Sequence, residues 1–188
     1  MQVLSVHHTF ARILVSTLVL LGAFSIVLIA EAAEVAVSPS TGSYGANQTF
    51  TVTIQANPQG KSINAVEAEL SFDKTKLSVV SVSKTGSAFS LWTTEPTFSN
   101  TAGTISFGGG SPSPFSTRSN LVSVTFRAVA EGSAAVTVTD ASVLAADGMG
   151  TDVYTAPVNG SYTVTAATAP TPTTPTPETP TAPAGTDS

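Results

Sequence analysis

The stretch that most constrains the fold of this chain is residues 65–82. Apolar and polar side chains alternate without interruption through residues 66–73. The apolar ones are Val66, Ala68, Leu70 and Phe72. Because successive side chains of a strand point to opposite faces of a sheet, this pattern predicts a strand with one buried and one solvent-facing side. A polar turn at 73–76 and a second apolar run at 77–82 complete a hairpin-like unit, which predicts an all-β domain.

Other stretches show the same alternation and are separated by Gly, Pro, Asn and Ser. They are residues 34–38, 49–56, 104–108, 120–130, 134–140 and 162–165. Residues 86–103 are less regular, and the sequence GGGSPSP at 108–114 is interpreted as a flexible loop. About nine short strands at this spacing predict a two-sheet β-sandwich without helices.

Charge and residue types exclude several classes of function. The net charge is -5, and the basic residues are scattered rather than gathered into the stripe that nucleic acid requires. The chain has no cysteine, and its two histidines are His7 and His8. If the N-terminal segment is removed, zinc sites that need His or Cys and catalysis by Ser-His-Asp or Cys-His are excluded. Glu67 and Glu69 point the same way along one strand, whereas glycosidase carboxylates must flank the bond, so we expect no enzyme.

The two ends of the chain differ from the middle. Residues 13–30 form a continuous apolar run, and Ala30, Glu31 and Ala32 fit a small-x-small cleavage site. We interpret residues 1–32 as a secretory signal peptide, with an uncleaved membrane anchor through residues 13–30 as the alternative. Both interpretations place residue 34 onward outside the cytoplasm, in a secreted or cell-surface protein.

The C-terminal segment 166–188 alternates Pro and Thr and has no apolar residue larger than Ala. Such a composition cannot form a core and favours an extended, polyproline-like linker or stalk. The sequence leaves open whether this segment is a free end or a connection to a further module.

Three blocks of the ordered part resemble the cohesin domain, the receptor module of cellulosome scaffoldins, within the carbohydrate-binding-module superfamily. The first is the strand-turn-strand at 68–77, which reads AELSFDKTKL and is similar to the family's signature of an apolar residue, any residue, an aromatic residue and Asp, followed after three intervening residues by Leu. The second is residues 120–130 followed by Glu131 and Gly132, and the third runs from Asp147 and Gly148 to the segment 158–164. The blocks occur in the family's order, and the resemblance covers residues 34–165.

This resemblance implies a nine-stranded, jelly-roll-like β-sandwich of which one sheet face binds a dockerin, a small helical domain carried by polysaccharide-degrading enzymes. Calcium in such a complex belongs to the dockerin, so no cofactor is expected on this chain. The partner is then a dockerin-type module or another cell-surface protein. The side chains that the matching face would expose are Glu67, Glu69 and Ser71 on the third strand, Thr104 and Ser106 on the sixth, and Thr137 and Thr139 on the eighth.

Four further interpretations remain open from the sequence. Trp92, near Phe89 and Phe98, is a candidate for stacking sugar rings in a direct carbohydrate-binding module, or else it fills the core. Asp73 either organises its turn or contacts a ligand. Asp140, Asp147 and Asp152 could form a calcium site, but their spacing favours solvated surface residues. The last alternative is a structural surface domain without a specific ligand.

Overall fold

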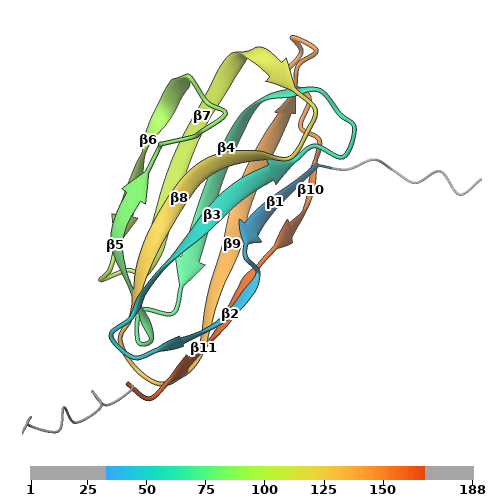
Figure 1. The fold of residues 1–188 in the computed structure, drawn as a ribbon. Helices are drawn as coiled ribbons and strands as arrows, with labels where there is room; N and C mark the ends of the chain where they lie inside the picture. The colour runs from blue at the N-terminus through green and yellow to red at the C-terminus, as the bar shows by residue number, and fades with distance from the viewer. Residues whose placement is uncertain (1–32, 168–188) are drawn as a thin grey trace, which may run out of the picture. The chain divides into compact units, whose positions relative to one another are not determined.

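The predicted alternation corresponds to two β-sheets packed face to face in the computed structural model, which describes residues 33–167 (Figure 1). One sheet has five strands, in the spatial order β10 (Tyr154–Val158), β1 (Ala33–Ser38), β3 (Thr49–Asn57), β8 (Ser119–Ala128) and β5 (Leu77–Ser83). The other has six, in the order β2 (Thr41–Gly45), β11 (Gly160–Thr165), β9 (Gly132–Ala145), β4 (Ile63–Phe72), β7 (Thr104–Phe115) and β6 (Leu91–Ser99). The described residues contain no helix, so the all-β sandwich is confirmed.

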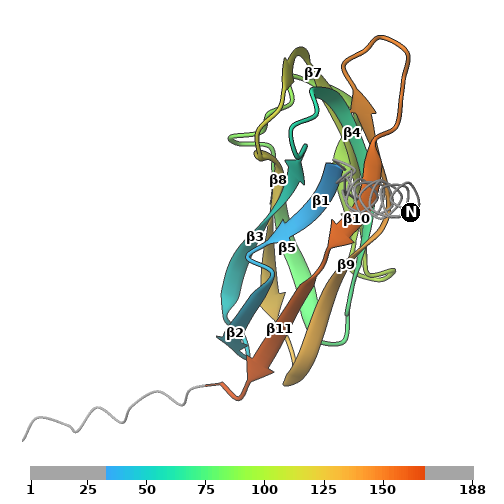
Figure 2. The same cartoon turned by 90° about the vertical axis from the view of Figure 1, so that its right-hand side faces the viewer.

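The expected number of nine strands is wrong, since residues 33–167 form eleven. The two unexpected strands, β2 and β10, are short and have no clear alternation of apolar and polar residues. Each is held by parallel backbone pairing, β2 to β11 and β10 to β1, rather than by a buried row of its own side chains. Strands β2 and β11 lie together at one end of the sandwich, and the loop from β9 to β10 projects from the other end (Figure 2).

The segments expected at the two ends of the chain fall outside the described residues. This holds for the signal segment at 1–32, with its apolar run at 13–30, and for all but the first two residues of the tail at 166–188. Within residues 33–167, nothing qualifies as a helix able to cross a membrane.

Aromatic rings join the two sheets in the core. Phe126 of β8 is fully buried, and its ring centroid lies 5.8 Å from that of Phe50 in the same sheet. It lies 5.4 Å from the ring centroid of Phe72, which belongs to the facing sheet. Tyr44 of β2 stacks on Phe50 at 3.8 Å, which closes the core at the end where β2 lies. Burying side chains of this size contributes about 1.5–3 kcal/mol each, so this cluster accounts for much of the sandwich's cohesion.

The turn after β4 is organised by Asp73, as one interpretation of the sequence predicted. Its Oδ1 accepts hydrogen bonds from the backbone N–H of Thr75 at 2.9 Å and from the Thr75 hydroxyl at 2.6 Å. The Asp73 carbonyl also accepts from the backbone N–H of Leu77 at 2.8 Å. These bonds fix the direction in which the chain leaves β4 for β5 in the other sheet.

Candidate functional site on the outer face of the six-stranded sheet

Strands β6, β7, β4 and β9 lie side by side in the six-stranded sheet, and one of their surfaces faces away from the core (Figure 1). We call this surface the outer face. Strand register arranges its side chains in cross-strand rows, described from the end where β4 begins. The rows are Leu91, Gly110, Ala65 and Leu144; then Thr94, Gly108, Glu67 and Ser142; then Thr97, Ser106, Glu69 and Asp140; then Ser99, Thr104, Ser71 and Thr137.

The structure brings the seven residues expected from the cohesin resemblance together around this face. Six of them stand in the last three rows: Glu67, Glu69, Ser71, Thr104, Ser106 and Thr137. The seventh, Thr139, lies at a bulge where β9 shifts register against β4 between Leu70 and Glu69. Its hydroxyl donates to the backbone carbonyl of Glu69 at 3.1 Å, so it supports the pairing of the two strands.

Acidic groups dominate the charge of this sheet. Its six strands carry four charged residues, all of them acidic: Glu67, Glu69, Glu95 and Asp140. Glu95, on the edge strand β6, forms an ion pair with Lys84 at 2.7 Å. The other three are exposed near the centre of the outer face and form no ion pair with any residue in 33–167. A small depression of about 80 Å³, the acidic hollow, lies between them and is also lined by Ala68, Ala141 and Ser142.

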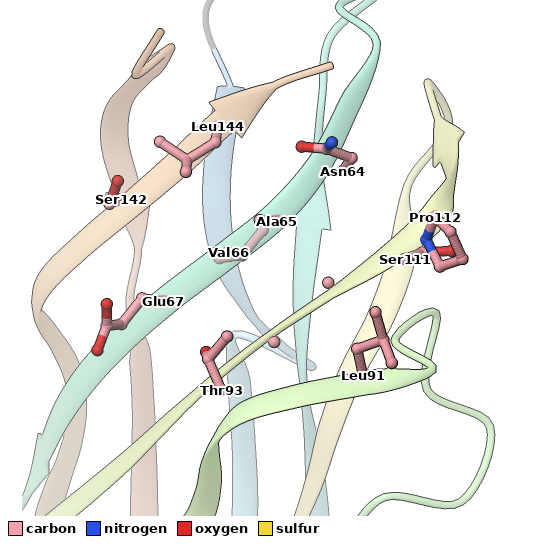
Figure 3. Close-up of a pocket in the computed structure, with 12 residues that line it drawn as sticks. Asn64, Ala65, Val66, Glu67, Leu91, Thr93, Ser111, Pro112, Ser142 and Leu144 are labelled. Carbon is pink, nitrogen blue, oxygen red and sulfur yellow. The ribbon is translucent and has the colours of Figure 1, made fainter. Parts of the chain in front are cut away.

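A larger depression of about 490 Å³, the apolar hollow, adjoins the acidic one at the end of the face where β4 begins (Figure 3). It exists because the first row has small residues, Gly110 and Ala65, between two leucines. Figure 3 shows Leu91 and Leu144 on opposite sides of the hollow with Ala65 between them. Leu91 is 61% exposed, so the apolar hollow is open to solvent on the side of β6.

Glycines of β7 form the floor of the apolar hollow. The prediction of a flexible loop at 108–114 is wrong. Strand β7 continues through this segment to Phe115. A Cβ atom at Gly109 would lie 2.7 Å from the Phe89 ring, and one at Gly110 would lie 2.6 Å from the carbonyl oxygen of Asn64. Strand pairing at this spacing therefore requires glycine, and a glycine run carries no alternation from which a strand could be predicted.

Trp92, the candidate for sugar stacking, is partly buried at the edge of the sandwich. Its ring meets the buried Phe89 edge-on, with centroids 5.3 Å apart, and the Lys84 ammonium lies over the ring at 5.2 Å from its centroid. Phe98 is 42% exposed but pairs opposite Ile105, farther along β6. The three aromatic residues therefore do not form one exposed row.

The three aspartates considered for calcium do not converge. Asp147 accepts hydrogen bonds from the Thr151 hydroxyl and the Met149 N–H, and these lower its pKa. Partial burial opposes ionisation of Asp152, but hydrogen bonds from the N–H groups of Tyr154 and Val143 outweigh it and lower the pKa of this carboxyl. Asp140 stands on the outer face opposite Glu69. Within residues 33–167, no group of three or more acidic or histidine side chains is arranged to hold a metal ion.

Comparison with known proteins identifies the family. The family model described as Cohesin domain matches residues 34–164. A search of the curated proteins found no match to the sequence.

Similar solved structures agree with this assignment. They include the solution structure of CaCohA2 from Clostridium acetobutylicum (22% identity, TM-score 0.57, covering 72% of this chain and 92% of that one). They also include a type I cohesin–dockerin complex from Clostridium thermocellum (12%, 0.60, 71% and 93%) and a non-cellulosomal cohesin from Archaeoglobus fulgidus (18%, 0.56, 72% and 92%). At these identities the likeness establishes the fold. Since the family model spans most of the chain and the sandwich matches solved cohesins, the protein belongs to the cohesin domain family.

Proposed function

We propose that this cohesin domain is a non-catalytic receptor module that binds a dockerin-type protein through the outer face of its six-stranded sheet. The observation that carries the proposal is the composition of this face, where exposed carboxylates and hydroxyls adjoin an open apolar hollow. Protein interfaces combine apolar contacts with polar and charged groups, and this face offers both side by side. Several solved relatives are complexes of a cohesin with a dockerin, which supports this class of partner.

The opposite sheet gives less support for a binding surface. Its outward hydroxyls pair across the strands, as between Thr51 and Thr125 at 3.1 Å, but it lacks the cluster of three exposed carboxylates that the outer face has in Glu67, Glu69 and Asp140. Direct carbohydrate binding through Trp92 has less support too, because Lys84 lies over the ring that a sugar would stack on.

A matched pair of variants tests this proposal. Ser106 on the outer face and Thr125 on the opposite sheet are both half-exposed and each shares a cross-strand hydroxyl hydrogen bond, of 3.0 and 3.1 Å. We expect Ser106→Trp to weaken dockerin binding about tenfold or more and Thr125→Trp to change it by less than about twofold, because only the first blocks the face. Isothermal titration calorimetry against a panel of purified dockerins in calcium measures both. The proposal fails if no dockerin in the panel binds the wild-type domain, or if the two variants behave alike.

We also propose that the domain works outside the cell, at a cell surface or in polysaccharide breakdown, with residues 1–32 as its export signal and 166–188 as its linker. The apolar run at 13–30 and the Pro-Thr composition of the tail support this location. N-terminal sequencing of the exported protein tests it, and we expect a mature chain that begins at residue 33. Recovery of the whole protein in the cytosolic fraction would contradict the proposal.

A further inference from the structure

We infer that the free edge of β5 is a latent pairing surface for the same edge of a second copy of this protein, and that the side chain of Asn100 keeps it closed. Strand β5 belongs to the five-stranded sheet, so this edge is separate from the outer face and its partner. Three features identify it: the residues of the edge strands, the hydrogen bonds of Asn100 and the bulge beside them.

The edge strands of the two sheets differ in how far their own residues oppose pairing with another chain. They are β10 and β5 in one sheet and β2 and β6 in the other. Charges, prolines and short length protect an edge: β6 contains Glu95 and Pro96, β10 contains Pro157, and β2 has five residues. Strand β5 reads LSVVSVS and contains no charged residue, proline or glycine. Such an uncharged segment, rich in β-branched residues, pairs readily with another strand when its edge is open.

The Asn100 side chain occupies the position at the edge of β5 where a neighbouring strand would pair. Its Oδ1 accepts a hydrogen bond of 2.7 Å from the backbone N–H of Val79, and its Nδ2 donates one of 2.9 Å to the carbonyl oxygen of the same residue. A side-chain amide offers the same donor and acceptor as a peptide group, so Asn100 takes the place of a partner strand. Asn100 lies in the turn between β6 and β7, and the two bonds hold this turn beside the edge.

A bulge next to Val79 adds to this protection. The register between β5 and β8 shifts between Val79 and Ser81, so Val80 is an extra residue in β5, and its side chain is 48% exposed. Bulges oppose regular pairing at an edge. Without the bonds to Asn100, residues 80–83 would offer an uncharged edge with an exposed apolar side chain. Antiparallel pairing of this edge with itself has two-fold symmetry, so a second copy is the partner that matches it in length and residues.

Removing the Asn100 side chain tests this role. We expect Asn100→Ala to form a dimer of about twice the monomer's mass at submillimolar concentration, whereas the wild type stays monomeric. Asn100→Ser, whose shorter side chain cannot bridge both backbone groups of Val79, is a second variant and should dimerise too. Size-exclusion chromatography with light scattering measures the mass, and circular dichroism with thermal unfolding establishes that each variant is folded.

Asn159→Ala is the matched control for these variants. The Oδ1 of Asn159 accepts a hydrogen bond of 3.0 Å from the backbone N–H of Val138 on β9, and β9 is enclosed between β11 and β4. This variant therefore loses a similar bond to a strand backbone without opening an edge. We expect it to be destabilised but monomeric.

Hydrogen exchange distinguishes strand pairing from aggregation of a destabilised chain. If β5 pairs with its copy, the backbone amides of residues 80–83 should gain protection as the concentration of Asn100→Ala rises, whereas destabilisation alone would lower protection throughout the domain. Adding Val80→Lys to Asn100→Ala should restore the monomer, because it places a charge on each of the two edges that would pair.

Dimerisation of the Asn100 variants alone, with protection at residues 80–83 and reversal by Val80→Lys, supports the assignment of this edge. It is overturned if the folded Asn100 variants stay monomeric, or if Asn159→Ala dimerises to the same extent. A dimer whose exchange protection lies outside β5 overturns it as well. None of these measurements involves a dockerin, so the proposed receptor function stands or falls separately.

Discussion

The hydroxyl of Tyr162 is a polar group held inside the sandwich. The residue is 1% exposed, and its hydroxyl donates a hydrogen bond of 2.7 Å to the carbonyl oxygen of Pro39. Burial raises the pKa of Tyr162, because an ionised phenolate would lose its hydration there. This single bond links the last strand of the domain to the connection between its first two strands.

We expect Tyr162→Phe to lower the free energy of unfolding by about 1–2 kcal/mol, because the Pro39 carbonyl loses its partner while the ring still fills the same space. Urea unfolding followed by circular dichroism measures the change. Tyr154→Phe is the control, since Tyr154 is only partly buried and its hydroxyl forms no such bond within the described residues. Equal effects of the two substitutions would show that the buried hydrogen bond does not contribute.

Asp73 makes the stability of the domain depend on pH in the acidic range. The hydrogen bonds from the Thr75 hydroxyl and N–H, with a smaller contribution from the charge of Lys76, hold the pKa of Asp73 below 3.8. Because the folded state lowers this pKa, the stabilisation is present above about pH 4 and is lost as the pH falls through the folded value. We expect the urea midpoint to fall between about pH 5.5 and about pH 3, and to fall less in Asp73→Asn. An unchanged pH dependence in this variant, judged against Asp140→Asn, would contradict the prediction.

At the scale of the strand, the sequence predicts strands whose buried residues alternate with exposed ones. It does not predict strands that are held by close packing of the backbone. Strands β3, β4 and β8 were predicted because their inward residues repeat every second position. Strands β2 and β10 were missed, since parallel backbone pairing holds them and leaves no pattern in their side chains. The glycine segment of β7 could not be predicted as a strand, because the space that excludes a Cβ there becomes visible only when β4 and β6 lie beside it.

The same limit applies to the candidate site. The outward positions of β4, such as Glu67 and Glu69, follow from alternation within one strand. The apolar row was not predicted, because Leu91, Ala65 and Leu144 come together only through the pairing of separate strands. That pairing depends on irregularities, including the register shift between Ile63 and Ala65.

Two glycines of β7 allow a test of its packing against β4. We expect Gly110→Ala to cost about 1–3 kcal/mol, because its Cβ would lie 2.6 Å from the backbone oxygen of Asn64, which cannot move without shifting the strand. Gly108→Ala should cost less than about 1 kcal/mol, since its nearest neighbours, at 3.0 and 3.4 Å, are side-chain atoms of Thr93 and Glu67 that can rotate away. Chemical denaturation of both variants measures the difference. A larger loss for Gly108→Ala would contradict the proposed packing.

At the scale of the whole molecule, the two sheets share one core but differ in their outer surfaces. The six-stranded sheet has an outer face with two hollows and only acidic charges, whereas the five-stranded sheet covers the core from the other side. Because the rings of Phe50, Phe72 and Phe126 connect the sheets, the outer face is held by a core to which both sheets contribute. Substitution of a buried residue in the five-stranded sheet should therefore lower the stability of both sheets rather than of one.

Phe126→Ala tests this coupling. Phe126 is fully buried on β8, and removing its ring deletes contacts to Phe50 on the same sheet and to Phe72 on β4. We expect a loss of about 3–5 kcal/mol in unfolding free energy, with both sheets still unfolding in one transition. Trp92 fluorescence reports on the edge of the six-stranded sheet and far-ultraviolet circular dichroism on all strands, so the two denaturation curves should coincide. If Trp92 unfolds at a different denaturant concentration from the bulk of the strands, the sheets are not cooperative and the outer face is held by the six-stranded sheet alone.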